Sequence, residues 1–274
     1  MQRENVLISI ITVCYNSEKT IARTIESILN QTYSNYEYIV IDGGSTDATI
    51  EIINKYEPFF KGKLKWVSEK DKGIYNAMNK GVLKSCGSVI GIVNSDDWLE
   101  ETALDSIGRR IANSDYNNNF LICGSIKFHY VDGRNEVWES DEDKFLKGIQ
   151  RRSYGHGAYH PAIFVSKDVY ENIGLFDERF KIVGDIDFIY RCYIQSCIFL
   201  FTKDVISNMS DGGVSNSFQF SKIYNDYKIF LKKQDVKGMA YLKELIGVLL
   251  KSTIKGFIPK SLLKRIRESK QDIR

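Results

Sequence analysis

Asp96 and Asp97 stand side by side at the end of an apolar run, Val89–Val93, where carboxylates can hold a cation. Such a run is typical of a buried strand in a parallel sheet, and open α/β sheets bind ligands beyond the carboxyl ends of their strands. Adjacent carboxylates repel each other unless a cation or a shared proton compensates, and Mg²⁺ prefers one or two carboxylates plus phosphate oxygens. The pair therefore predicts a divalent metal site. The alternative is that Asp97 caps a helix starting near Leu99.

Two other predicted strands, Val6–Val13 and Tyr36–Ile41, also end in polar or aromatic residues. A nucleoside diphosphate could bind at one sheet edge that carries an aromatic ring, a carboxylate and an acidic pair able to bind a metal. The ring would pack on the base, the carboxylate would accept a hydrogen bond from the base or ribose, and the ion would neutralise the diphosphate. The candidate binding residues at these two strand ends are Thr12, Tyr15, Asn16, Asp42 and Ser45. Neither GxGxxG after the first strand nor Gx4GK[ST] occurs, which disfavours dinucleotide-binding and P-loop folds.

The elements that must position these residues alternate along the first hundred residues. Ser17 is predicted to cap a helix, Ser45, Thr46 or Asp47 to cap a second, and a third runs from Ile74 to Gly87. The resulting β-α-β-α-β-α-β order predicts a parallel, right-handed doubly wound sheet. The second half predicts a hairpin at residues 131–134, helices near residues 167–173 and from Asp185, and a mostly helical stretch over 217–270.

Composition and charge narrow the function classes. The 274 residues suffice for one large domain, or one domain with an appendage. The formal net charge of +3 conceals an asymmetry, because residues 237–274 hold ten Lys or Arg against three Asp or Glu. The slightly acidic remainder argues against a nucleic-acid-binding protein. Five scattered cysteines without a CxxC pair favour reduced thiols over zinc, and no run of about 18 apolar residues predicts a membrane span. We therefore expect a cytoplasmic protein.

Seven motifs occur in an order and spacing that resemble a known family. They read ISIITVCYN, YIVIDGGSTDAT, DKGIYNAMNKG, GIVNSDDWL, HPAIF, FKIVGDIDFIYR and SDGGVS. Over residues 6–215 the chain resembles family 2 glycosyltransferases of the GT-A fold, with the closest likeness to bacterial enzymes of colanic-acid, capsule and O-antigen assembly. The resemblance implies a Rossmann-like, mostly parallel sheet with helices on both faces. It implies a catalytic domain over 1–215, with a donor-binding half at about 1–100 and an acceptor-binding half at about 100–215, followed by a helical extension over 216–274.

The resemblance also implies an activity. It predicts an inverting transferase that uses Mg²⁺ or Mn²⁺ and moves a sugar from a nucleotide-sugar donor, with a UDP-sugar expected. The acceptor would be a glycan or a lipid-linked molecule in bacterial surface polysaccharide biosynthesis. By position, the family's nucleotide-binding residues match Thr12, Tyr15 and Asp42, with Asn16 and Ser45 as weaker members and Lys72 as a candidate for the donor's nucleotide or phosphates.

Motif position also assigns the acidic residues. Asp97 matches the metal-binding aspartate of the family's DxD position, and Asp96 would lie nearer the ribose, although Ser95 stands where that triplet often begins with Asp. Asp185 matches the catalytic base and is favoured over Asp187, which suits the first turn of a helix. Two sites stay open. His156 and His160 lie in a loop expected to face the acceptor, where His160 could touch an acceptor phosphate or be a structural loop residue. Trp98 could pack or contact a sugar.

Two other classes of function remain compatible with the pattern. A sugar-phosphate nucleotidyltransferase shares the architecture and an acidic metal site. However, such enzymes usually carry a Gly-rich, basic loop after the first strand, and residues 12–16 contain neither Gly nor Lys. A catalytically inactive sugar-binding or scaffold protein is the second alternative, and the presence of both Asp97 and Asp185 argues against it.

The basic C-terminal end predicts its own partner. Between Met239 and Ile258, apolar residues recur at helical spacing and lysines surround them. A helix with an apolar stripe and a basic surround is typical of a segment that lies on an anionic membrane surface. The alternative is that the stripe docks on the catalytic domain. The first interpretation predicts a peripheral protein on the inner face of the cytoplasmic membrane.

Overall fold

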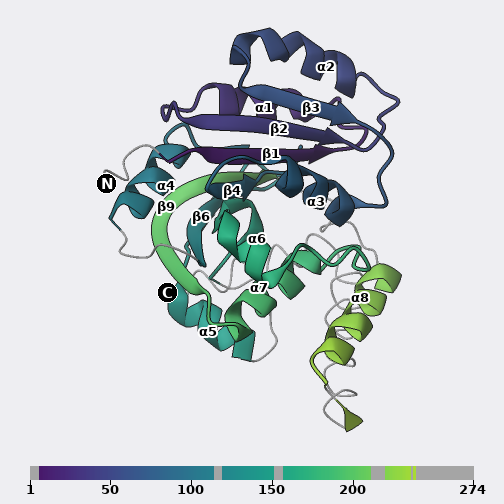
Figure 1. The fold of residues 1–274 in the computed structure, drawn as a ribbon, viewed down its shortest axis with the longest axis vertical. Helices are drawn as coiled ribbons and strands as arrows, with labels where there is room; N and C mark the ends of the chain where they lie inside the picture. Colours follow the sequence, from purple (N-terminus) through teal and green to yellow (C-terminus); the bar gives the residue numbers. More distant parts are fainter. Residues whose placement is uncertain (1–5, 114–118, 151–156, 211–219, 236, 239–274) are drawn as a thin grey trace. The chain divides into compact units, whose positions relative to one another are not determined.

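The computed structural model describes residues 6–113, 119–150, 157–210, 220–235 and 237–238 (Figure 1). In its first part, strands and helices alternate as predicted. These elements are β1 (Ile8–Cys14), α1 (Ile21–Leu29), β2 (Tyr36–Asp42), α2 (Thr49–Tyr56), β3 (Leu64–Ser68), α3 (Ile74–Lys84) and β4 (Val89–Ile92). The four strands pair in parallel in the order β3-β2-β1-β4, so the β-α-β alternation is confirmed. The carboxyl ends of β1, β2 and β4 therefore meet at one edge of the sheet.

Helix starts differ from the sequence-based expectations. Helix α1 begins after Thr20, and the hydroxyl of Ser17 lies 2.8 Å from that of Ser95 instead of capping the helix. After Asp97 the chain continues as a short strand, β5 (Trp98–Leu99), so the alternative that Asp97 caps a helix is wrong. The N-cap of α2 is Ala48, and none of the three expected residues holds that position. The carboxylate of Asp47, one residue earlier, accepts the backbone N–H of Thr49 at 3.0 Å.

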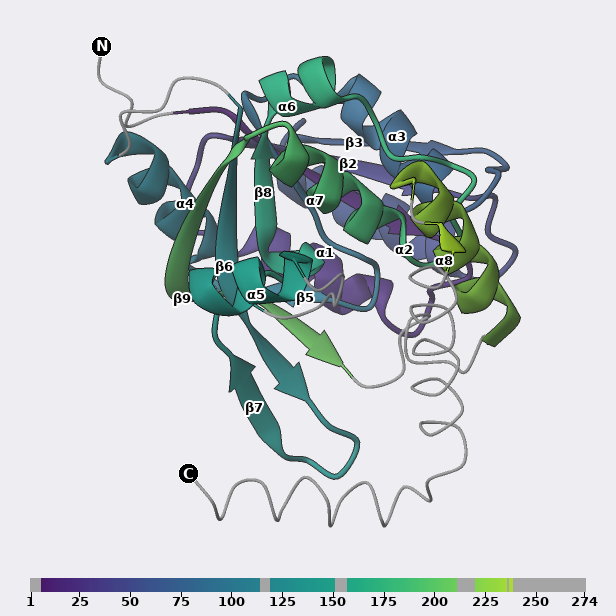
Figure 2. The ribbon, with the colours of Figure 1, turned by 90° about the horizontal axis from the view of Figure 1, so that it is seen from below.

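The second part of the sheet is mixed rather than parallel. Its remaining elements are α4 (Ala103–Ala112), β6 (Phe120–His129), β7 (Asn135–Trp138), α5 (Glu142–Gln150), β8 (Ile163–Ser166), α6 (Lys167–Ile173), α7 (Gly184–Ile194) and β9 (Ile198–Ser210). The sheet continues from β4 through β8, β6, β9 and β5, and only β6 and β9 are parallel here. The predicted hairpin is β6–β7, which projects from the sheet in Figure 2. Antiparallel neighbours need no helical crossover, and so the alternation stops after β4.

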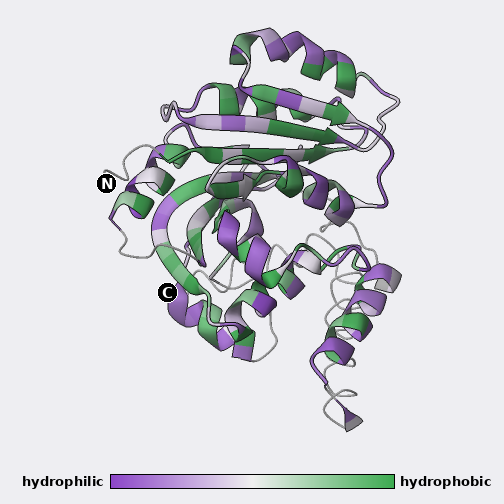
Figure 3. Ribbon diagram, in the orientation of Figure 1, coloured by the Kyte–Doolittle hydropathy of each residue, from purple (hydrophilic) through white to green (hydrophobic). Residues whose placement is uncertain are grey.

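Helices cover both faces of the parallel strands. Ile8 and Ile10 of β1 belong to the main core cluster together with Ile25 of α1. Ile11 points to the other face, where a Cβ added to Gly81 of α3 would lie 2.4 Å from its Cγ2. Successive residues of β1 thus face opposite helix layers, which explains why the whole strand is buried and most of it is apolar, as the hydropathy colours of Figure 3 show.

Residues 179–183 and 214–274 form a second compact unit. Its described part holds α8 (Phe220–Lys233), a helix inside the stretch predicted to be mostly helical. Within this unit the buried carboxylate of Asp226 accepts the backbone N–H groups of three consecutive residues. These are Lys181, Ile182 and Val183, at 2.9, 2.6 and 3.1 Å. The basic amphipathic stretch Met239–Ile258 lies outside the described residues.

Candidate active site

The loops after β1, β2 and β3 converge on Gly43. A Cβ added to Gly43 would lie 2.4 Å from Oδ2 of Asp71 and 3.5 Å from Cβ of Tyr15. The three loops can therefore approach this closely only around a residue without a side chain. Tyr15 itself is 61% exposed, which leaves its ring accessible at this edge of the sheet. Asp71 was not among the predicted site residues, although its place just after β3 is the signal that could have found it.

Asp42 organises the loop that follows β2. Its Oδ2 accepts the backbone N–H groups of Gly44 and Ser45, each at 2.9 Å, and the Ser68 hydroxyl at 2.7 Å. The Ser45 hydroxyl donates to the other carboxylate oxygen. Burial alone would raise the pKa of Asp42, but these hydrogen bonds outweigh it and lower that pKa. Asp42 is therefore ionised at neutral pH and already well supplied with donors.

Asn16 and Ser45 join the first two loops to each other. The backbone N–H of Asn16 donates to the Ser45 hydroxyl at 2.8 Å, and the Asn16 side-chain oxygen accepts the backbone N–H of Thr46 at 2.9 Å. Asn16 adopts a left-handed backbone conformation, with φ of 49°, that asparagine tolerates better than most residues. With Asp42, these residues shape the site edge as a single hydrogen-bonded network.

Two of the predicted nucleotide-binding residues lie apart from this network. Thr12 is completely buried within β1, and its hydroxyl lies 3.0 Å from the hydroxyl of Tyr38. Thr12 is therefore placed to stabilise the end of β1 from inside the protein. Lys72 is exposed just before α3, where its backbone N–H donates to the side-chain oxygen of Asn76 at 3.2 Å.

The acidic loop after β4 is held from two directions. Helix α1 contributes the guanidinium of Arg23, which donates to the backbone oxygen of Asp96 at 2.9 Å, and the hydroxyl of Thr24, which donates to that of Asp97 at 2.7 Å. From the end of β9, the Ser210 hydroxyl donates to the Asp96 backbone oxygen at 3.4 Å. These contacts fix the backbone of the loop through its carbonyl oxygens and do not involve the two carboxylates.

Asp97 and Asn94 are hydrogen-bonded neighbours, and both side chains carry oxygen atoms that a metal ion could use as ligands. Asp97 is only 3% exposed, and its pKa is raised well above the usual range by burial and then by the charge of Asp96. The Asn94 amide nitrogen donates to Asp97 Oδ2 at 3.2 Å. The Asn94 amide oxygen is buried and has no hydrogen-bond partner within the described residues. Carboxylate and amide oxygens are ligands that Mg²⁺ and similar hard cations take, so this set fits a divalent cation.

The protein offers few ligands beyond this set. Among the residues that the structure describes, no three His, Cys, Asp or Glu side chains gather into a metal-binding cluster. A cation here would take its remaining oxygens from substrate phosphates or water, which is how Mg²⁺ is commonly bound. The sequence analysis did not select Asn94, because its buried amide oxygen without a partner is visible only in the folded loop.

Trp98 packs within the protein. The guanidinium carbon of Arg23 lies 3.6 Å from the centre of its ring, and the His129 ring lies at a centroid distance of 4.7 Å. Because a cation over an aromatic face is attracted by the ring, this contact helps to hold Arg23 beside the acidic loop. The structure thus favours the packing role of Trp98 over a sugar platform.

Asp185 lies in the first turn of α7 and is partly exposed. The hydroxyl of Tyr75, from α3, donates to its Oδ1 at 3.2 Å. Asp187 is buried and accepts the guanidinium of Arg191 at 2.9 Å. Of the two aspartates, Asp185 is therefore the one whose carboxylate can reach a substrate.

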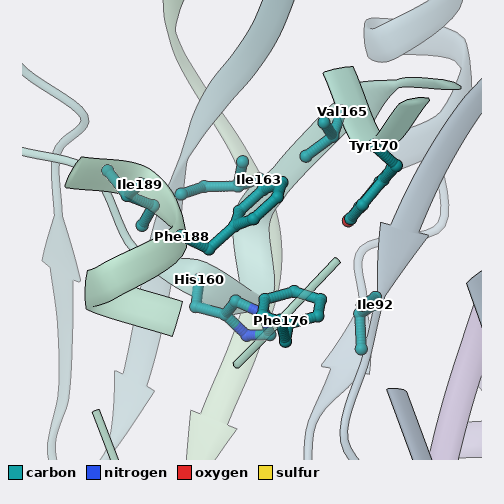
Figure 4. Close-up of a pocket in the computed structure, with 8 residues that line it drawn as sticks. All are labelled: Ile92, His160, Ile163, Val165, Tyr170, Phe176, Phe188 and Ile189. Atoms are coloured by element: carbon teal, nitrogen blue, oxygen red, sulfur yellow. The ribbon is translucent and has the colours of Figure 1, made fainter. Parts of the chain in front are cut away.

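His160 lies near Asp185, against a small apolar cavity (Figure 4). Its ring packs edge-on against Phe176 at a centroid distance of 6.2 Å. The cavity is lined by Ile92, His160, Ile163, Val165, Tyr170, Phe176, Phe188 and Ile189. Burial lowers the pKa of His160, and the charge of Asp185 opposes this only in part. A neutral imidazole in apolar surroundings favours the structural role over phosphate binding. His156 lies outside the described residues.

Comparison with known proteins decides the family. The family model for Glycosyl transferase family 2 matches residues 9–174. The chain belongs to glycosyl transferase family 2. A PGL/p-HBAD biosynthesis glycosyltransferase of Mycobacterium bovis is 28% identical over 214 residues, which cover 77% of this chain and 80% of that protein. The family 2 assignment makes the chain a glycosyltransferase, and the matched region includes the acidic loop.

Solved structures confirm the GT-A fold for this family 2 glycosyltransferase. Staphylococcus aureus TarS 1–349 in complex with UDP-GlcNAc aligns with a TM-score of 0.66 at 19% identity, covering 91% of this chain and 72% of that one. The chain spans 43% of a longer TarS structure. The mannosyltransferase PcManGT from Pyrobaculum calidifontis, in complex with GDP-Man and Mn²⁺, has a TM-score of 0.62 at 15% identity, with 96% and 79% of the two chains covered. In the described part of this chain, no helix is both long and apolar enough to cross a bilayer.

Proposed function

We propose that this family 2 enzyme transfers a sugar, with inversion, from a nucleotide-sugar donor to a glycan or lipid-linked acceptor of a surface polysaccharide. The observation that carries the proposal is the acidic loop after β4, clamped by Arg23 and Thr24. It holds the buried carboxylate of Asp97, which accepts the amide nitrogen of Asn94, and the amide oxygen of Asn94 has no hydrogen-bond partner among the described residues. A site of this kind suits a diphosphate, and both solved neighbours hold nucleotide sugars. We take a UDP-sugar as the first candidate donor.

The donor would lie along the carboxyl edge of β1, β2 and β4. Asp97 and Asn94 would hold Mg²⁺ or Mn²⁺, with Asp96 directed toward the ribose. When bound, such a cation supplies positive charge that neutralises the donor diphosphate. The exposed ring of Tyr15 would pack on the base, and the network of Asp42, Ser45 and Asn16 would shape the pocket around the nucleoside. Lys72 would approach the phosphates.

Asp185 would act as the general base. Its carboxylate would take the proton from the acceptor hydroxyl as that oxygen forms a bond to the anomeric carbon of the donor sugar. At the same time the bond from that carbon to the diphosphate breaks, and the nucleoside diphosphate leaves from the opposite face with the electron pair. Because attack and departure occur on opposite faces, the configuration of the anomeric carbon inverts.

The proposal predicts which donors release their nucleotide. The purified full chain would be incubated with UDP-glucose, UDP-galactose, UDP-GlcNAc and GDP-mannose, each with Mn²⁺, Mg²⁺ or EDTA. We expect slow hydrolysis of a UDP-sugar that requires the metal, measured as UDP release. Pyrophosphate formed from UTP and a sugar 1-phosphate would instead show a nucleotidyltransferase. Neither binding nor hydrolysis of any donor would indicate a scaffold protein.

We also propose that residues 239–258 bind an anionic membrane surface, where a lipid-linked acceptor would be found. Each basic residue near such a surface contributes on the order of 1 kcal/mol. Replacing Lys243, Lys251 and Lys255 by Gln should therefore weaken binding to phosphatidylglycerol-containing vesicles by roughly a hundredfold. Vesicle sedimentation measures this, with neutral phosphatidylcholine vesicles and 0.5 M salt as controls. Equal binding by the wild-type chain to neutral and anionic vesicles, or to neither, would contradict the proposal.

A further inference from the structure

Tyr75 connects α3 to the start of α7. It is the second residue of α3, its side chain is 4% exposed, and its ring stacks on Phe176 at a centroid distance of 5.8 Å. Its hydroxyl donates to Oδ1 of Asp185 at 3.2 Å. The backbone N–H groups of Gly184 and Asp185 donate in turn to the same hydroxyl oxygen. One phenol thus contacts both the side chain and the backbone of the proposed base.

This contact replaces an ordinary helix cap. The first N–H groups of a helix have no partner within it, and a Ser, Thr, Asp or Asn side chain usually satisfies them. At α7 the acceptor is the hydroxyl oxygen of Tyr75, which comes from another helix. Gly184 makes the approach possible, because a Cβ at that position would lie 2.7 to 2.9 Å from three ring carbons of Tyr75. The glycine and the tyrosine therefore form a matched pair.

We infer that Tyr75 is a positioning residue, which fixes the first turn of α7 and orients the Asp185 carboxylate toward the acceptor hydroxyl. This inference rests on the proposed role of Asp185 as the base. A single hydrogen bond to Oδ1 leaves Oδ2 to take the proton, and the buried ring keeps the hydroxyl in one place. Preorganisation of this kind removes the cost of orienting the base at the moment of reaction.

The charges around Asp185 support a donor role for Tyr75. Burial, and then the negative charge of Asp185, raise the pKa of Tyr75 well above its usual range, so the hydroxyl keeps its proton. His160 faces the same carboxylate, and burial lowers its pKa. On α7 itself, Asp187 is paired with Arg191 at 2.9 Å. Of these three described side chains, Tyr75, His160 and Asp187, Tyr75 is the one that forms a hydrogen bond with the Asp185 carboxylate.

The contact can be tested without any substrate. In the full chain labelled with ¹³C-aspartate, the carboxyl resonance of Asp185 is identified by its loss in Asp185→Asn. The Tyr75 hydroxyl donates to Oδ1 of this carboxylate, so the resonance should change its chemical shift in Tyr75→Phe, where that hydroxyl is absent. Tyr170→Phe is the matched control. It removes another buried hydroxyl from the same aromatic cluster, and its ring contacts Phe176 and Phe188. There the resonance should stay in place.

Kinetics provide the second readout. With the donor that the panel identifies, Tyr75→Phe should lower kcat about tenfold or more with an unchanged KM for the donor, because misplacement of a reacting group acts on the chemical step. Gly184→Ala, which crowds the ring and keeps the hydroxyl, should act in the same direction. It covers the case in which Tyr75→Phe does not fold.

The outcomes separate this inference from the proposed function. If Asp185→Asn is inactive but Tyr75→Phe leaves the Asp185 resonance and kcat unchanged, the positioning role is wrong and the base assignment stands. If Asp185→Asn keeps its activity, the base assignment fails, while the carboxyl resonance still shows whether the Tyr75 contact exists.

Discussion

Asp185→Asn is expected to abolish sugar transfer and to leave donor binding intact. The amide keeps the shape of the side chain and its place at the start of α7, but it cannot accept the proton of the acceptor hydroxyl. General bases contribute about 10²–10⁴-fold to rate, so kcat should fall within that range. Nucleotide affinity, measured by calorimetry with UDP and Mn²⁺, should not change, since Asp185 would act on the acceptor.

Asp187→Asn is the matched control, because the same change is made two residues along the same helix. Asp187 is 1% exposed and carries the ion pair with Arg191 at 2.9 Å, so its loss should act on folding. Removing one partner of a buried ion pair lowers the free energy of unfolding by on the order of 3 kcal/mol. Urea denaturation would detect this as a lower unfolding midpoint. Near-normal turnover in Asp185→Asn, with turnover lost in a folded Asp187→Asn, would show that the base is Asp187.

Asp97→Asn is expected to remove the metal dependence of donor binding. The amide is isosteric but carries no charge, so the site would offer a divalent cation only neutral side-chain oxygens from Asn94 and the new residue, beside Asp96. Replacing a residue that only orients a metal ligand lowers metal affinity by about 10–100-fold. Loss of a direct ligand should therefore lower it by at least about 100-fold. Titration calorimetry of UDP, and separately GDP, with and without Mn²⁺ would measure this loss.

Glu37→Gln is the control for that experiment. Glu37 is a buried carboxylate of the same sheet, but it lies near the amino end of β2, where it accepts the Ser9 hydroxyl at 2.7 Å. It should change stability and leave nucleotide binding as it is. If Asp97→Asn stays folded and binds UDP with the same Mn²⁺-dependent affinity as the wild-type chain, the metal assignment is refuted.

The sequence predicted those parts of the fold that depend on local pattern. Apolar runs such as Val89–Val93 can be buried on both faces only in a strand between helix layers, so the order of strands and helices could be read directly. The positions of Asp42 and Asp97 just beyond strands followed from the same runs. The first residues of α1 and α2 were harder to place, because Ser17 and Asp47 could each have bonded locally or across the fold.

The parts that escaped prediction depend on contacts between distant residues. Nothing near Tyr75 in sequence shows that its hydroxyl contacts Asp185, because the two residues are 110 positions apart and meet only in the folded protein. The buried state of the Asn94 oxygen is likewise a property of the folded loop. Thr12 matched the family motif, yet its place inside β1 follows from the strand boundary, which lies at Cys14. The roles of these site residues remain predictions.

The pairing of β5 with β9 has a consequence for the order in which the enzyme is made. Trp98 and Leu99 pair with Asn208 and Ser207, more than a hundred residues later in the chain. As the ribosome synthesises the protein, the parallel strands are complete once β4 has emerged. The acidic loop, however, still lacks β9, which pairs with β5 directly after the loop. A nascent chain without β9 therefore has the loops after β1 and β2 in place, but its acidic loop is held on both sides only after Ser210 has been synthesised.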